Sequence, residues 1–121
     1  MSDPLFSPEH PNETLLDPDE RRQLRLLIED SRYWLENGTF PPDEIAVRFH
    51  HRLVLIHPFP NGNGRHGRLA ADLLAVRLGQ ARFTWGRVNL LEPEETRRRY
   101  IAALRAADAH DIRPLLDFAR S

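Results

Sequence analysis

Residues 55–69 (LIHPFPNGNGRHGRL) combine side chains and turn formers that could bind a phosphate group. The Gly62–Gly64 segment consists of residue types that tolerate positive φ, so its backbone can curl with successive N–H groups pointing inward. If a helix begins directly afterwards, its unpaired N–H groups and the positive end of its dipole face the same place. Arg65 and Arg68 project to one side of such a first turn, and guanidinium groups suit phosphate oxygens. The pattern favours a di- or triphosphate site over a plain glycine-rich turn with two solvated arginines.

His57 stands directly before this loop, where it could serve as a general base. A neutral imidazole can accept the proton of an incoming hydroxyl while the loop holds the phosphate under attack. A lone histidine is more often a core or capping residue. The neighbouring glycines and arginines nevertheless favour the catalytic interpretation.

Two other motif interpretations are disfavoured. Gly62-x-Gly64-x-x-Gly67 matches the dinucleotide-binding fingerprint, but that pattern requires a preceding strand and a parallel βαβ unit. Four histidines lie close to the loop: His50, His51, His57 and His66. Adjacent residues of a helix point to different faces, and no cysteine or glutamate completes a metal-ligand spacing, so a zinc site is not predicted.

The elements that must hold this loop are predicted to be helices. Asp17 is a suitable N-cap, Pro18 fits the first helical position, and Asn37-Gly38 predicts the end of a first helix. Its apolar residues fall near one stripe: Leu24, Leu27, Ile28, Trp34 and Leu35.

Four further helices complete the expected architecture, an all-α fold of about five helices. A second helix should begin near Pro42 and end at His57-Pro58, because the residue before proline avoids helical geometry. A third should begin inside the glycine loop and end at Gly79. The apolar residues of the second to fifth helices are Ile45, Phe49, Leu53 and Ile56; Leu69, Leu73, Val76 and Leu78; Tyr100, Ile101 and Leu104; and Leu115, Leu116 and Phe118. Residues 82–85 could form a short strand, which alone makes no sheet.

Length and composition indicate one modest domain. The chain has 121 residues, 40% of them hydrophobic, and we expect an extended lead-in over residues 1–16 and a single domain over residues 17–121. It contains no cysteine, which favours a reducing cytoplasm, and no apolar run that predicts a membrane span. A net charge of −1 argues against a nucleic-acid binder. Because the chain has no lysine, any phosphate clamp must use arginine, histidine and backbone N–H groups.

The segment HPFPNGNGRHGR, residues 57–68, resembles the signature HPFx[DE]GNGRxxR of the Fic (filamentation induced by cAMP) family. The resemblance extends from the helix before His57 to roughly Ala107, and is greatest to the Fic proteins called mobile mystery protein B. It implies an all-α fold that transfers AMP from ATP, with Mg²⁺, to a Ser, Thr or Tyr hydroxyl of a target protein. It also implies a bacterial, cytoplasmic protein of the toxin–antitoxin kind.

The same resemblance implies a role for each residue of the motif. His57 would deprotonate the target hydroxyl, and Phe59 would be buried and fix the loop. Gly62, Asn63 and Gly64 would form the anion hole for the transferred phosphate. Arg65 and Arg68 would hold the other phosphates, and pyrophosphate would leave.

Asn61 departs from the family pattern, which has Asp or Glu there to coordinate Mg²⁺. A neutral amide oxygen is a weaker ligand for this hard cation. Three consequences stay open: a loosely held metal, slow catalysis, or a different reaction. The alternatives are transfer of UMP, phosphocholine or a γ-phosphate by the same loop, and a weakly active remnant that binds a nucleotide or a partner.

Two accessory features of the family are not predicted. Residues 17–48 show no pattern of the β-hairpin flap that holds the target, so a reduced core is expected. The segment SRYWLEN, residues 31–37, resembles the inhibitory helix [ST]xxxE[GN] but fails, because Glu36 lies five residues after Ser31. Any inhibition would then come from a separate antitoxin chain.

Overall fold

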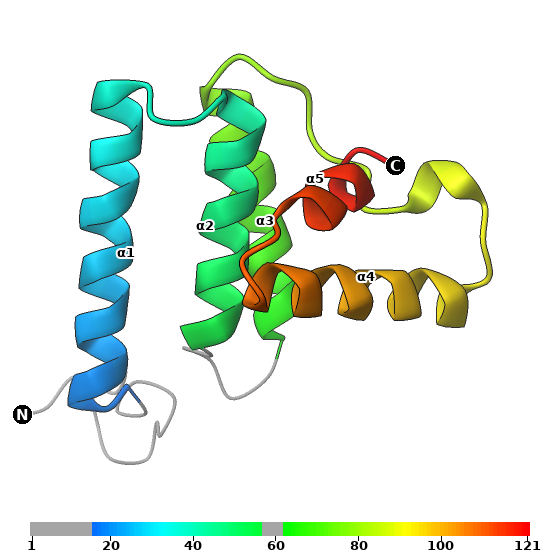
Figure 1. The fold of residues 1–121 in the computed structure, drawn as a ribbon, viewed down its shortest axis with the longest axis horizontal. Helices are drawn as coiled ribbons and strands as arrows, with labels where there is room; N and C mark the ends of the chain where they lie inside the picture. The colour runs from blue at the N-terminus through cyan, green and yellow to red at the C-terminus, as the bar shows by residue number, and fades with distance from the viewer. Residues whose placement is uncertain (1–15, 57–61) are drawn as a thin grey trace, which may run out of the picture.

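The computed structural model describes residues 16–56 and 62–121, and its regular elements are all helical (Figure 1). The described part of the chain contains no strand, which confirms the expected all-α class. The elements are α1 (Pro18–Asn37), α2 (Pro42–Ile56), α3 (Asn63–Arg77), the 3₁₀ turn η3 (Arg87–Asn89), α4 (Pro93–Asp108) and α5 (Arg113–Ala119). The expected lead-in over residues 1–16 lies outside the described residues except for Leu16, as do His57, Phe59 and Asn61.

The first helix begins and ends where local sequence signals predict. The Asp17 carboxylate accepts a hydrogen bond from the Glu20 N–H at 2.8 Å, and Pro18 occupies the first turn. Gly38 closes the helix in the left-handed conformation, at φ 58°, and its N–H donates to the Trp34 carbonyl. Such a cap satisfies carbonyls that a helix end otherwise leaves unpaired.

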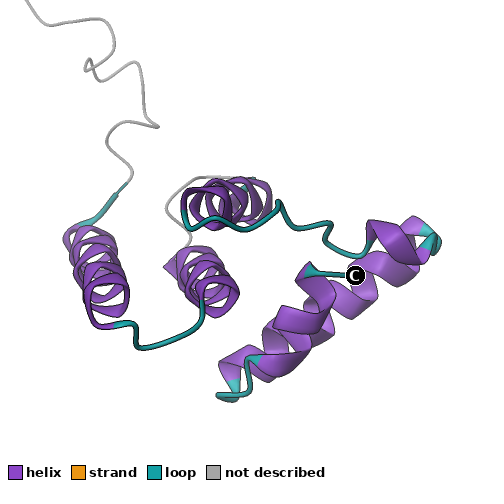
Figure 2. Cartoon of the chain, turned by 90° about the horizontal axis from the view of Figure 1, so that it is seen from above, coloured by secondary structure: helices purple, strands orange, loops and turns teal. Residues whose placement is uncertain are grey.

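Helices α1, α2 and α3 stand roughly side by side, and α4 lies roughly at right angles to them, on the side away from α1 (Figure 1). Viewed from above, α1 lies at one edge, α2 and α3 lie together, and α4 and α5 form a pair at the opposite side (Figure 2). Helix α2 is therefore central, with α1 and α3 packed against it.

The contact between α2 and α3 depends on small residues of α3. Gly67, Ala71 and Ala75 are buried and recur every four residues, so they share the face that meets α2. The larger apolar residues of the predicted stripe, Leu69 and Leu73, are 49% and 54% exposed. The spacing of these leucines thus predicted the helix correctly. In the structure, however, the leucines lie on its outer face, because close packing of α3 on α2 requires small side chains.

The hydrophobic core lies where α2, α3, α4 and α5 meet residues 83–85. Its buried members are Ala46, Val47, Ala71, Ala75, Phe83, Trp85, Ala103, Ala107, Leu115, Phe118 and Ala119. Alanine is prominent in this core, so the helices approach each other closely and the aromatic rings fill the remaining space.

Residues 82–86 form no strand, and their backbone pairs with the end of the chain instead. The N–H groups of Thr84 and Trp85 both donate to the Ala119 carbonyl at 2.9 Å, and Gly86 N–H donates to the Ser121 carbonyl at 2.8 Å. Arg120 holds the same region, because its guanidinium forms two hydrogen bonds with the Asp43 carboxylate at the start of α2. The backbone contacts hold residues 84–86 against the end of α5.

Candidate functional site

The first turn of α3 has the geometry expected of an anion-binding turn. Gly62 is left-handed, at φ 73°, and α3 begins at the next residue. The first helical hydrogen bond runs from the His66 N–H to the Gly62 carbonyl at 2.9 Å. A helix supplies no internal partner for the N–H groups before that bond, and the positive end of its dipole lies there. The sequence therefore placed the start of this helix correctly, inside the glycine loop.

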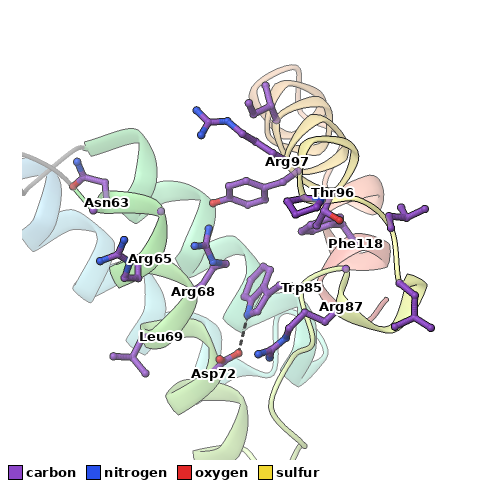
Figure 3. A pocket seen from close by; sticks show the side chains of 18 residues that line it. Asn63, Arg65, Arg68, Leu69, Asp72, Trp85, Arg87, Thr96, Arg97 and Phe118 are labelled. Carbon is purple, nitrogen blue, oxygen red and sulfur yellow. Dashed lines mark hydrogen bonds between the residues drawn. The ribbon is translucent and has the colours of Figure 1, made fainter.

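A pocket of about 1190 Å³ opens beside this turn (Figure 3). Three walls enclose it: the first turns of α3, residues 85–91, and one face of α4 together with Phe118. All five described residues that the motif nominates line it, namely Gly62, Asn63, Gly64, Arg65 and Arg68. The remaining nominated residues, His57, Phe59 and Asn61, fall in the part of the chain that is not described.

Arg68 lies at the inner end of the pocket, against Tyr100. Its guanidinium carbon is 5.3 Å from the centre of the tyrosine ring, within the range of a cation–π contact. A Cβ at Gly64 would lie 3.3 Å from Arg68 Nη1 and 3.5 Å from the Tyr100 hydroxyl oxygen. Glycine at position 64 therefore leaves room for both groups at the first turn of α3. Among the described residues, neither Arg65 nor Arg68 forms a salt bridge with a carboxylate.

Sequence reasoning missed a buried pair behind Arg68. His50 on α2 is fully buried, and its Nε2 lies 2.8 Å from the Tyr100 hydroxyl oxygen on α4. Burial lowers the pKa of His50 to about 4, so the imidazole is neutral at pH 7. The two residues are 50 positions apart, and no local spacing could have indicated that they meet.

Trp85 belongs to the core as well as to the pocket wall. It is 8% exposed, its ring centre lies 4.8 Å from that of His50, and its Nε1 donates to Asp72 at 3.0 Å. The same Asp72 oxygen also accepts the Phe83 N–H at 3.2 Å. Trp85 is thus fixed in place, and its contacts are those of a structural aromatic residue.

The described residues do not by themselves form a magnesium site. No cluster of three or more histidine or acidic side chains suited to a metal ion occurs within residues 16–56 and 62–121. Asp72 is the one acidic residue among the described residues that line the pocket, and one of its oxygens already accepts two hydrogen bonds. The expectation for Asn61 lies outside the described residues. No described helix is both long and apolar enough to cross a membrane.

Comparison with known proteins identifies the family. Residues 7–75 match the model of the Fic/DOC family. The fold and the pocket thus belong to a helical protein whose glycine-rich turn carries the family motif. This chain is a member of the Fic/DOC family.

The chain is similar to named relatives from animals. It is 36% identical over 94 residues to "Protein adenylyltransferase fic-1" of Caenorhabditis elegans, which covers 75% of this chain and 17% of that protein. It is 34% identical over 98 residues to "Protein adenylyltransferase Fic" of Drosophila grimshawi, covering 78% and 19%. The solved structure of C. elegans Fic-1, residues 134–508, superposes with a TM-score of 0.64 at 34% identity, covering 84% of this chain and 28% of that one.

This chain spans less than a fifth of the length of these curated relatives. Their animal origin gives no support to the expectations of a bacterial source or an antitoxin partner. What the comparisons do support is the expected family and the expected fold.

Proposed function

We propose that this domain binds ATP at the first turn of α3 and transfers AMP to a hydroxyl group of a protein. The observation that carries the proposal is the convergence of the Gly62–Gly64 turn, Arg65 and Arg68 on one pocket. The relatives named protein adenylyltransferases support it, because this chain is similar to them in sequence and in fold.

In the proposed reaction each motif residue has the role that the family resemblance implies. His57 comes directly after the last residue of α2, and takes the proton from the attacking Ser, Thr or Tyr hydroxyl. The hydroxyl oxygen then bonds to the α-phosphorus of ATP. The bond from that phosphorus to the bridging oxygen breaks, and pyrophosphate leaves.

The domain contributes mainly positioning and charge stabilisation. The N–H groups at the first turn of α3 hold oxygens of the transferred phosphate. Arg65 and Arg68 hold the β- and γ-phosphates, whose charge grows as pyrophosphate departs. Both roles require the turn and the two arginines to face the same pocket, which all of them line.

ATP labelled at the α- or the γ-phosphate tests this function directly. Incubated with the protein, Mg²⁺ and a cell lysate, α-labelled ATP is expected to mark a protein band that the lysate alone does not show, and γ-labelled ATP is expected to add no such band. The reverse result would show a kinase-like reaction at the same loop. If isothermal titration detects no ATP binding to the wild type, the phosphate-binding role of the turn is wrong.

A second prediction is that the residue at position 61 affects how ATP binding depends on Mg²⁺. Mg²⁺ is proposed to accompany ATP, held chiefly by phosphate oxygens and water, because an amide oxygen is a weak ligand for it. Asn61→Asp is expected to lower the Mg²⁺ concentration needed for half-maximal ATP binding by about tenfold, the effect of one added carboxylate ligand. Titration of ATP at a series of Mg²⁺ concentrations measures it, with Asn89→Asp on the exposed η3 turn as the matched control.

The same variant separates an active enzyme from a nucleotide-binding remnant. If Asn61→Asp transfers label from α-labelled ATP while the wild type binds ATP but transfers none, the remnant interpretation is correct. Equal Mg²⁺ dependence in both proteins would show that residue 61 does not contact the metal.

A further inference from the structure

Tyr100 lies outside the motif, and a role for it in ligand binding rests on the proposed function. Tyr100 lines the pocket from α4, and its hydroxyl lies close to both Arg68 and the first turn of α3. A phosphate held at that turn would lie within reach of the hydroxyl. What the hydroxyl can offer to a phosphate depends on how it is bonded to His50.

The hydrogen bond between His50 Nε2 and the Tyr100 hydroxyl can run in either direction. A neutral imidazole carries one N–H donor and one acceptor nitrogen. If the proton is on Nδ1, then Nε2 accepts and the tyrosine spends its only proton on His50. If the proton is on Nε2, the histidine donates and the tyrosine proton is left for another acceptor.

The surroundings of Nδ1 favour the second arrangement. Nδ1 is buried and makes no hydrogen bond of good geometry among the described residues, although the Gly67 backbone lies near enough to His50 to offset part of the effect of burial on its pKa. A buried N–H without an acceptor is costly and rare. A Cβ at Gly67 would lie 2.9 Å from Nδ1, so a hydrogen on the Gly67 Cα points toward this nitrogen. A lone pair tolerates that C–H group as a weak donor, whereas an N–H would oppose it.

The tyrosine also keeps its proton under ordinary conditions. Burial raises the pKa of Tyr100 above its usual value, and the nearby charge of Arg68 opposes this only in part. The phenol is therefore neutral at pH 7. With two lone pairs and one proton, it can accept from His50 and still donate.

We propose that Tyr100 is a further phosphate-binding residue of this site. Its hydroxyl accepts a hydrogen bond from His50 Nε2–H and donates its own proton to a phosphate oxygen of the nucleotide. His50 is a positioning residue, since it holds the hydroxyl and leaves its proton directed at the ligand. Arg68 stacks on the same ring, so α4 supplies both a donor and a support for the guanidinium.

Tyr100→Phe tests the hydroxyl, because it keeps the ring that faces Arg68. Isothermal titration with ATP and with tripolyphosphate is expected to show at least tenfold weaker binding of both, since a hydrogen bond to a charged group is lost. Tripolyphosphate has no nucleoside, so its loss reports on the phosphate contact alone. Tyr33→Phe is the matched control. Tyr33 is the other tyrosine and is 61% exposed on α1, so this variant should bind both ligands as the wild type does.

A second measurement needs no variant. Long-range ¹H–¹⁵N spectra of the histidine-labelled wild type report which imidazole nitrogen carries the proton, and we expect Nε2–H at His50. An Nδ1–H tautomer would overturn the proposal even if Tyr100→Phe fails to fold. Equal affinities in Tyr100→Phe and the wild type would also overturn it and leave ATP binding intact. A wild type that binds neither ATP nor tripolyphosphate would instead refute the proposed function, and this proposal with it.

Discussion

His57→Ala is expected to lower AMP transfer at least a hundredfold and to leave ATP binding nearly unchanged. The neutral hydroxyl of a target protein is a poor nucleophile, and a positioned base typically contributes 10²- to 10⁴-fold to such a step. In the proposed function, phosphate binding depends on the N–H groups of α3 and on Arg65 and Arg68, which line the pocket and which the substitution does not remove. The rate from α-labelled ATP and the affinity from isothermal titration measure the two effects separately.

His51→Ala is the control for this prediction. His51 lies on α2 six residues earlier, and its Nε2 contacts Asp108 at 2.8 Å rather than the pocket. The His51→Ala protein should transfer AMP at close to the wild-type rate. A His57→Ala protein with wild-type activity would exclude His57 as the base, whereas simultaneous loss of ATP binding would assign it a structural or binding role.

Local signals predicted the boundaries of the helices well. Asp17 caps α1 and Gly38 ends it, and α3 begins one residue after Gly62. Each of these features depends on a few neighbouring residues: a side-chain oxygen near free N–H groups, or a glycine that can adopt positive φ. The residues that make these interactions are close together in the sequence, so the sequence alone is sufficient to predict them.

Contacts between residues of different helices could not be predicted from local sequence signals. The sequence emphasised the large apolar residues of α3, but the face that meets α2 carries Gly67, Ala71 and Ala75. Small residues give little hydrophobic signal, although they decide how closely two helices approach. The pairing of His50 with Tyr100 likewise depends on how α2 and α4 cross, which no short window of sequence records.

The structure of the pocket wall that follows residues 82–85 could not be predicted from local sequence signals either. Residues 82–85 have the composition of a short strand, but the N–H groups of Thr84 and Trp85 bond to the carbonyl of Ala119, the last residue of α5. A strand requires a neighbour with a matching edge, and the described residues provide only the end of the chain. The glycine that follows, Gly86, has to turn the backbone at this junction.

Gly86→Ala is expected to destabilise the protein by about 2–5 kcal/mol, the sum of two costs. Gly86 has φ 84°, and a left-handed conformation costs a residue with a Cβ about 1–2 kcal/mol. The new methyl group would also lie 2.8 Å from Phe118 Cε1 and 3.1 Å from Thr96 Cγ2. Overpacking of this kind costs about 1–3 kcal/mol, because the ring and α4 must shift.

Gly79→Ala separates the two costs. Gly79 has nearly the same conformation, φ 85°, but nothing lies within 4 Å of the position of its Cβ. It should therefore lose only about 1–2 kcal/mol, the conformational cost alone. Urea denaturation measures the free energy of unfolding of both variants. An equal decrease in the two would show that Phe118 moves aside without an energetic cost. Since Phe118 packs on Tyr100 at 5.5 Å between ring centres, a forced shift should weaken ATP binding in Gly86→Ala but not in Gly79→Ala.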